Sequence, residues 1–346
     1  MKSNVYFIKV TDKDPQTRVS SLRKLLKTID PFSTYKKDDF LPVKLTIGDA
    51  KCIYNISPEL VKTVISEIKK KNKRPFLFDT NVIYKGSRLN AVDHLTLAQN
   101  KGFAHSRVGA PFIIADGLFG QDGREYELDS KYIKKIKIPS FIGMTENLVV
   151  LSHVTSHILA GYAASLKNVS MGMCSRPTKQ VQHSSVKPHI IKEKCTACGL
   201  CVEICPVNAI SLDKKAYIDQ TKCIGCGECL CACKFDAISI NWKEDLDIFS
   251  KKVVDVAKFI LSKFKNKFFI NFAFDITKEC DCISTKSEPM ISKDFGILAS
   301  NDILSLEKAT IDLIEKDDLQ NSSYKKLFEY ASSNGLGNLE YNLVEI

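Results

Sequence analysis

The chain has 346 residues, of which 44% are hydrophobic and 26% are charged, and its formal net charge is +10. This length predicts roughly two domains, and the hydrophobic share is ordinary for a globular protein. The charge does not indicate a nucleic-acid-binding protein, because 43 of the basic residues are lysines and only seven are arginines. Lysines spread over predicted helix faces are typical of a solvated surface and not of a phosphate-reading one.

The sequence contains no segment typical of secretion or membrane insertion. The first ten residues, MKSNVYFIKV, lack an apolar core, and the longest apolar stretch, residues 148–169, is interrupted by His153, His157 and three serines. We therefore expect a cytoplasmic protein with no membrane span.

Strand-like and helix-like segments alternate through the first half of the chain. Among the helices, the one that starts at Ser57-Pro58 has the clearest beginning, since proline suits the first helical position. The predicted strands are 5–10, 41–47, 75–79, 112–115 and 148–153, and the predicted helices are 15–29, 57–70, 91–100 and 158–166. This order is typical of an α/β protein whose mostly parallel sheet has helices on both faces.

The same alternation returns in the last hundred residues. We predict a helix over 246–264, a buried strand over the apolar run 268–274, a strand over 296–299 and a helix over 305–315. These elements either form a separate C-terminal domain or complete the sheet of the first half.

Between the two halves lies a doubled cysteine pattern. The run Cys195, Cys198, Cys201, Cys205 returns 28 residues later as Cys223, Cys226, Cys229, Cys233, with the same spacing. Each run places three thiols on one tight loop, and a glycine (Gly199 or Gly227) follows the second cysteine, where backbone N–H groups can turn towards sulfur. This pattern indicates an electron-transfer module.

Residues 188–242 resemble the bacterial-type dicluster ferredoxin, with CTACGLCVEICPVNAI matched by CIGCGECLCACKFDAI. The resemblance implies two 4Fe-4S clusters in which the fourth cysteine of each run binds the cluster of the other. One cluster is then held by Cys195, Cys198, Cys201 and Cys233, and the second by Cys223, Cys226, Cys229 and Cys205. Lys234 stands where the first run has Pro206, and Cys231 is an additional cysteine between two ligands.

Other uses of these cysteines fit less well. Structural zinc does not need eight cysteines in two interlocked runs, and disulfides are disfavoured without a secretory segment. We expect Cys52, Cys174 and Cys231 to be plain buried thiols. The pair Cys280 and Cys282 could contribute to a metal site, but a chelate needs further ligands.

Outside the cysteine-rich segment, polar residues gather at the ends of the predicted strands. Because ligands of an α/β sheet bind at the carboxyl ends of its strands, these residues predict a polar pocket. They are Lys44, Asp79 to Asn81, Asp116, His153, His157, Lys167, Asn168 and Asp275.

Several segments resemble the family catalogued as domain of unknown function 362, whose members are described as uncharacterised iron-sulfur centre proteins. The segments are FDTNVIYKGSRLNAVDHL, IIADGLFGQDG, LSHVTSHILAGYAASLKNVSMGM, RPTKQVQHSSVKPHI, DITKECDC and GILASND. The resemblance implies one α/β unit formed by residues 1–187 and 243–346, with the ferredoxin segment 188–242 inserted. It also implies a polar core of His153, His157, Lys167, Asn168, Lys179 and His183.

Each of these polar residues also has a structural interpretation. Asp79 and Asn81 could cap the loop after a strand. His153 and His157 could bind a metal from one helix face, but at a strand end they would diverge. Lys167 and Asn168 could end a helix, with the lysine near the negative end of its dipole.

We interpret the chain as an iron-sulfur oxidoreductase that passes electrons between its clusters and a pocket for a small anionic substrate. His153, His157, Lys167 and Asn168 are the predicted catalytic residues; Lys44, Asp79, Asn81, Lys179 and His183 are the predicted substrate-binding residues. Its partner would be that substrate or a redox protein. No nucleotide-binding fingerprint occurs in the sequence. Two alternatives remain open: a pure electron carrier with a docking domain, and a metal or cluster assembly factor that uses Cys280 and Cys282.

Overall fold

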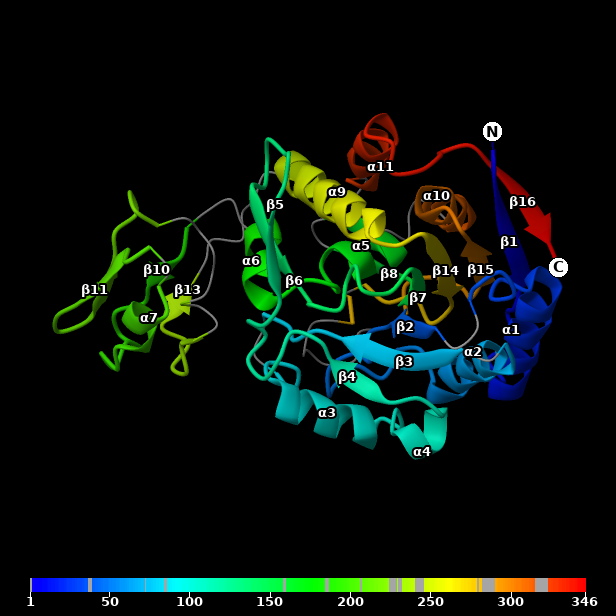
Figure 1. Cartoon of the computed structure of the whole chain (residues 1–346), viewed down its shortest axis with the longest axis horizontal. Helices are drawn as coiled ribbons and strands as arrows, with labels where there is room; N and C mark the ends of the chain where they lie inside the picture. Colours follow the sequence, from blue (N-terminus) through cyan, green and yellow to red (C-terminus); the bar gives the residue numbers. More distant parts are fainter. Residues whose placement is uncertain are drawn as a thin grey trace.

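The computed structural model describes residues 2–36, 39–71, 73–83, 86–157, 160–183, 187–205, 207–223, 229, 232–239, 246–278, 280–281, 290–314 and 323–346. Its largest element is an eight-stranded sheet with the order β16-β1-β15-β14-β7-β2-β3-β4 (Figure 1). The strands are β1 (Ser3–Lys9), β2 (Phe40–Lys44), β3 (Arg74–Asp79), β4 (Phe112–Ile114), β7 (Asn147–His153), β14 (Asn266–Ala273), β15 (Gly296–Ser300) and β16 (Tyr341–Glu345).

Most neighbours in this sheet run parallel. The five strands from β14 to β4 form a continuous parallel block, β16 runs parallel to β1, and β15 pairs antiparallel with both β1 and β14. The predicted mostly parallel α/β sheet is therefore confirmed. The sheet combines strands from both sides of residues 188–242, since β14, β15 and β16 follow that segment in the sequence.

Helices cover both faces of the sheet (Figure 1). One apolar core packs against α1 (Pro15–Ile29), α2 (Pro58–Lys70), α3 (Ala91–Asn100) and α4 (His105–Val108). The other packs against α5 (Ser165–Ser170), α9 (Leu246–Ser262), α10 (Ile303–Leu313) and α11 (Tyr324–Ser333). Strand β7 serves both cores, because its alternate residues point to opposite faces and all seven are buried.

Local sequence signals account for the helix starts. The Asp14 carboxylate accepts a hydrogen bond from Thr17 N at the start of α1, and the Ser57 hydroxyl accepts one from Leu60 N at the start of α2. In both helices a proline occupies the first helical turn. Satisfying these otherwise unpaired N–H groups explains why α1 begins where its sequence predicts.

The predicted helix over 158–166 is wrong. The described part of this region forms β8 (Thr155–His157) and β9 (Gly161–Ala163), which pair antiparallel, and only then does α5 begin. Gly161, with φ of 72°, opens the second strand in a backbone conformation that favours glycine. The stretch is apolar throughout, so periodicity could not separate a buried hairpin from a buried helix.

Several elements had no clear pattern in the sequence. They are the hairpin β5 (Arg124–Glu127) and β6 (Lys135–Ile138), helix α6 (Arg176–His183), helix α11 and the edge strand β16. Helix α6 is rich in polar residues, yet seven of its eight residues are buried. We attribute the helical conformation of α6 to its buried position in the fold and not to an apolar face.

The cysteine-rich segment forms a small lobe of short elements beside the main sheet (Figure 1). Strand β10 (His189–Ile190) pairs with β13 (Ile238–Ser239), β11 (Ile210–Leu212) pairs with β12 (Ala216–Ile218), and α7 spans Leu200–Glu203. The sequence repeat also appears in the backbone: Asn208 and Asp236, 28 positions apart, have φ angles of 49° and 51°. Among the described residues, none of the helices has the length and apolar composition needed to cross a bilayer.

Candidate functional site

A polar cavity of about 100 Å³ lies at the carboxyl ends of β2, β3 and β7. Parallel strands end at the same sheet edge, so the last residues of these three strands, Lys44, Asp79 and His153, all line it. Seven of the nine predicted pocket residues line this cavity: Lys44, Asp79, His153, Lys167, Asn168, Lys179 and His183. Asn81 and His157 are not among its lining residues.

Lys44 is fully buried and has three close partners. Its Nζ lies 2.9 Å from Asp79 Oδ1, and it donates hydrogen bonds to Asn168 Oδ1 at 2.6 Å and to the Leu45 carbonyl at 2.8 Å. Asn168 in turn donates to the Leu151 carbonyl and the Ser152 hydroxyl of β7. Asn168 therefore joins α5 to two strands and does not end a helix.

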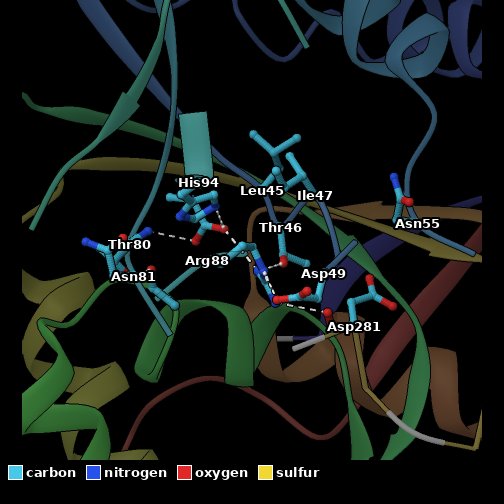
Figure 2. Close-up of polar contacts among 12 residues, drawn as sticks. Leu45, Thr46, Ile47, Asp49, Asn55, Thr80, Asn81, Arg88, His94 and Asp281 are labelled. Carbon is cyan, nitrogen blue, oxygen red and sulfur yellow. Dashed lines mark hydrogen bonds and ion pairs between the residues drawn. The ribbon is translucent and has the colours of Figure 1, made fainter. Parts of the chain in front are cut away.

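Arg88 connects the loops around the cavity, as Figure 2 shows. Its Nη1 donates to Thr46 Oγ1 at 2.8 Å and lies 3.5 Å from Asp79 Oδ2, while its Nη2 donates to the Asp281 carbonyl at 2.9 Å. Asp49 Oδ2 lies 3.8 Å from Arg88 Nε. The guanidinium thus ties residues from three distant parts of the chain to one point.

Asp79 is the most heavily paired carboxylate of the site. Besides Lys44 and Arg88, His94 Nε2 lies 3.6 Å from its Oδ2. Burial alone would raise the pKa of Asp79, but the interactions of its carboxylate with Lys44, His94 and Arg88 together outweigh burial and hold that pKa well below its usual range. Asp79 is therefore ionised at every pH near neutrality and fixes the position of its basic neighbours.

Lys179 comes from α6 and approaches the cavity from another side. Its Nζ donates to Thr80 Oγ1 at 2.6 Å and to the Asn81 carbonyl. Asn81 is held in turn by Asp116, which accepts hydrogen bonds from its backbone N at 2.9 Å and its side-chain Nδ2 at 3.0 Å. Asn81 thus does not line the cavity, but its carbonyl holds Lys179 in place.

His153 is engaged at both ring nitrogens. Nδ1 lies 3.0 Å from Asp281 Oδ1, and Nε2 lies 3.0 Å from the Phe274 carbonyl. Two acceptors are satisfied only by the doubly protonated ring. Burial opposes this form, but Asp281 more than compensates, and the pKa of His153 is raised. His153 therefore orients Asp281 at the cavity.

The rings of His157 and His183 pack against an aromatic side chain, unlike the ring of His153. Both rings contact Phe249 of α9, with centroid distances of 6.2 and 5.9 Å. Burial, together with the charge of Lys167, lowers the pKa of His157 well below its usual value and that of His183 to about 3. Both imidazoles are neutral near pH 7, and His153 and His157 have separate partners, so they do not share a metal-binding face.

Lys167 lies on α5 and is partly exposed at the cavity. Its Nζ is 3.1 Å from Cys280 Sγ. Cys282, the second cysteine of that pair, lies outside the described residues. Cys174 is buried and Cys52 is half-buried, which agrees with their interpretation as plain thiols, and Cys231 is outside the described residues.

The cavity carries an excess of basic groups over carboxylates. Lys44, Arg88, Lys167 and Lys179 line it, against the carboxylates of Asp79 and Asp281. Its apolar lining residues are Val82, Ile83, Ala163, Ala164 and Met171, and uncharged polar residues such as Thr46, Thr80 and Asn168 complete the wall. Such a lining suits a small anion with a short apolar part.

Some residues of the site were not identified from the sequence, and others were identified without their role. Arg88 and His94 lie within the family-like segment FDTNVIYKGSRLNAVDHL but were not singled out there, and only their contact with Asp79 reveals their role. Asp281 lies between Cys280 and Cys282, and from the sequence only these two cysteines were considered there, so Asp281 was given no role. Across the described residues, no three His, Cys, Asp or Glu side chains converge closely enough to hold a single metal ion.

A second cavity lies in the cysteine-rich lobe. Its walls include Cys195, Cys198 and Cys201 of the first run and Cys233 of the second. Cys205 Sγ accepts a hydrogen bond from Ala209 N at 3.2 Å, and Cys233 Sγ accepts one from Ala237 N at 3.3 Å. Among the predicted ligands of the other cluster, Cys226 lies outside the described residues.

Comparison with solved structures gives several distant similarities. The chain aligns with a protein from Thermotoga maritima at 9% identity, covering 94% of this chain and 60% of that one, with a TM-score of 0.45. It also aligns with the lactate racemase apoprotein from Thermoanaerobacterium thermosaccharolyticum at 12% identity, covering 80% and 51%, with a TM-score of 0.42. The chain therefore spans less than two thirds of the length of either structure.

No curated protein matches the chain. The family model described as "Domain of unknown function (DUF362)" matches residues 43–312, which include the carboxyl end of β2, the cavity and the cysteine-rich lobe. This match covers most of the sequence, and the protein belongs to that family.

Proposed function

We propose that the protein is an iron-sulfur oxidoreductase that transfers electrons between two 4Fe-4S clusters in its cysteine-rich lobe and a small anionic substrate in the cavity of its α/β body. The observation that carries this proposal is the cavity in the lobe, where Cys233 of the second run joins Cys195, Cys198 and Cys201 of the first. Eight cysteines in two equal runs suit two such clusters.

The residues around this second cavity fit a cubane better than a single metal ion. In a 4Fe-4S cluster each thiolate binds a different iron, so the sulfurs surround a volume and do not converge on a point. Backbone N–H groups already point at Cys205 and Cys233, and such hydrogen bonds stabilise thiolate ligands. Bound clusters would supply one-electron transfer, chemistry that the side chains of the cavity cannot supply themselves.

The α/β body would supply binding and positioning. Lys44 and Arg88 are held by Asp79 and give the cavity a fixed positive wall, while Lys167 is partly exposed and can approach a ligand. A pure docking module does not need a buried polar cavity of this kind, so the cavity favours an enzyme over a carrier.

One helix links the two sites. Lys179 and His183 on α6 line the main cavity, and α6 ends only six residues before β10 of the lobe begins. The ligand site and the lobe are therefore neighbours along the chain.

The first test is the cluster content of the protein purified without oxygen. We expect about eight iron and eight sulfide per chain, with the electron paramagnetic resonance signals of 4Fe-4S clusters after reduction. A preparation that contains zinc and no sulfide would contradict the proposal.

The second test concerns the cavity. The Lys167→Ala variant should keep its iron and its thermal transition but lose small anions that co-purify with the wild type, as measured by mass spectrometry of the denatured protein. Lys135→Ala, which removes an exposed lysine of the β5–β6 hairpin, is the matched control. If both variants retain the same ligands as the wild type, the carrier interpretation replaces the enzyme.

A further inference from the structure

Two buried lysines of the main cavity have different kinds of partner. Lys44 has the carboxylate of Asp79 at 2.9 Å. Lys179 donates only to neutral oxygens, the Thr80 hydroxyl and the Asn81 carbonyl, and among the described residues no carboxylate lies within ion-pair distance of its Nζ. Burial lowers the pKa of Lys44 even so, but Asp79 opposes burial directly, whereas neutral acceptors stabilise an ammonium group much less than a carboxylate does.

The Lys179 nitrogen is held in a defined orientation. Two of its three substituent positions donate hydrogen bonds, and the third has no hydrogen-bond partner among the described residues. Thr80 is itself fixed, because its hydroxyl donates to the Gly172 carbonyl at 2.8 Å. A neutral amine held by two N–H donors would carry its lone pair at the third position, and Lys179 lines the cavity.

Helix α6 keeps this lysine from moving away. The Thr178 hydroxyl accepts a hydrogen bond from Lys137 N at 2.7 Å, and Arg176 Nη1 donates to the Phe119 carbonyl at 3.1 Å. Two residues that precede Lys179 in α6 are therefore tied to the β5–β6 hairpin and the loop before it. Such support positions a reacting group.

The surroundings also favour the neutral amine. Burial lowers the pKa of Lys179 to about 8; Asp116 and Asp79 act against burial, while the charge of Lys44 acts with it. The neutral amine is therefore more populated in Lys179 than in an exposed lysine. A buried lysine with a lowered pKa is a usual nucleophile towards carbonyl carbon.

We propose that Lys179 is the nucleophile of the cavity and that it binds small anionic carbonyl compounds, of the 2-oxo acid class, as an imine. The inference rests on the part of the proposed function that makes this cavity a ligand site, and it does not depend on the clusters. The basic lining attracts the carboxylate, and the volume of about 100 Å³ admits a molecule of only a few heavy atoms.

The reaction is a condensation that needs no oxidant or reductant. The Lys179 lone pair adds to the carbonyl carbon, and proton transfer from nitrogen to the former carbonyl oxygen gives a carbinolamine. Loss of water then forms the C=N bond, so one ligand and one amine give one imine and one water. The Thr80 hydroxyl, 2.6 Å from Nζ, is placed to hold the nitrogen during this step.

The test is reductive trapping on the full chain. The holoprotein is incubated at pH 7 with glyoxylate or pyruvate and sodium cyanoborohydride, and the modified lysine is identified by peptide mass spectrometry. We expect Lys179 to be modified at least tenfold faster than exposed lysines, and Lys44 to remain unmodified because of its ion pair. Equal modification of Lys179 and surface lysines would overturn the inference without the need for any variant.

Two variants sharpen the assignment. Lys179→Arg keeps the positive charge and should abolish the rapid phase, whereas Lys135→Arg should leave it unchanged. If the rapid phase persists in Lys179→Arg, another residue is the nucleophile and the inference fails.

Oxalate separates a failure of the Lys179 inference from a failure of the proposed anion site. It is an anion of similar size to pyruvate but has no reactive carbonyl. If oxalate raises the thermal midpoint of the wild type but no imine is trapped, the anion site stands and the Lys179 inference falls. If neither oxalate nor pyruvate changes the thermal midpoint and no imine is trapped, both the anion site and the Lys179 inference are wrong. Rapid trapping on Lys179 that oxalate suppresses supports both.

Discussion

Lys44 Nζ and Asp79 Oδ1 lie 2.9 Å apart at the ends of two adjacent parallel strands, and their side chains are only 0% and 4% exposed. The pairing of β2 with β3 brings the two residues together across 35 positions of sequence. Because Asp79 also holds Arg88 and His94, this ion pair is the centre of the positive wall of the cavity.

Removing one member of this pair should be costly. Lys44→Met leaves a buried carboxylate without its closest cation, and we expect a loss of about 3–5 kcal/mol in the free energy of unfolding, measured by urea denaturation. Lys135→Met is the matched control, because its ion pair with Glu125 is 60% and 56% exposed, and the expected loss is below about 1 kcal/mol. Similar losses of unfolding free energy in both variants would show that other groups stabilise the Asp79 carboxylate when Lys44 is absent.

Glu307 is buried in α10, where its Oε1 accepts a hydrogen bond from Leu166 N at 2.7 Å, and it should make stability decrease as pH rises. Burial raises its pKa to about 7 from an ordinary 4.5, so between these values the folded state keeps a proton that the unfolded state releases. This contribution is fully present below pH 4.5 and is lost as pH rises through about 7. Relative to Glu307→Gln, the wild type should lose about 3 kcal/mol over that range.

The comparison requires unfolding curves of both proteins from pH 4.5 to pH 8, with the difference in free energy taken at each pH. The difference removes the titration of His157 and His183, which both proteins share. A difference that does not vary with pH would mean that Glu307 is ionised in the folded protein.

The body of the protein should not fold from its first part alone. In the sheet, β14 and β15 lie between β1 and β7, so a fragment of residues 1–187 lacks the strands that join its two sides. We expect no cooperative thermal transition for this fragment. As a control, the full chain with residues 188–242 replaced by a flexible linker should retain one. A sharp transition of the fragment would indicate two independent domains.

The cysteine pattern predicts crossed ligation of the two clusters. Cys205→Ser should remove the cluster bound by Cys223, Cys226 and Cys229, and roughly half of the iron, so its resonance spectrum should match that of Cys226→Ser and differ from that of Cys198→Ser. Cys231→Ser is the control and should keep all of the iron. If Cys205→Ser instead matches Cys198→Ser, each run binds its own cluster.

Structural features that depend on only a few neighbouring residues could be predicted from the sequence. The bounds of α1 and α3 follow from capping residues and periodicity, and the strands that end in Asp79 and His153 were recognisable as apolar runs followed by polar residues. The predicted strand 41–47 was too long at its carboxyl end, because β2 ends at Lys44. Since parallel strands end at one edge, the position of a polar cavity followed as well. Apolar periodicity was not enough at 158–166, where a buried hairpin and a buried helix have the same composition.

The chemistry of each side chain depends on partners far away in sequence. Lys44 and Lys179 are the same residue type in the same cavity, but one meets a carboxylate 35 positions away and the other meets a hydroxyl and a carbonyl 99 and 98 positions away. The pKa of His153 is raised because the chain returns with Asp281 after 128 residues. The sequence by itself determined which groups reach the carboxyl edge of the sheet and how the cysteines are spaced. Only the tertiary structure decided which of those groups are paired, because protonation depends on burial and on the charge of neighbours that local sequence does not specify.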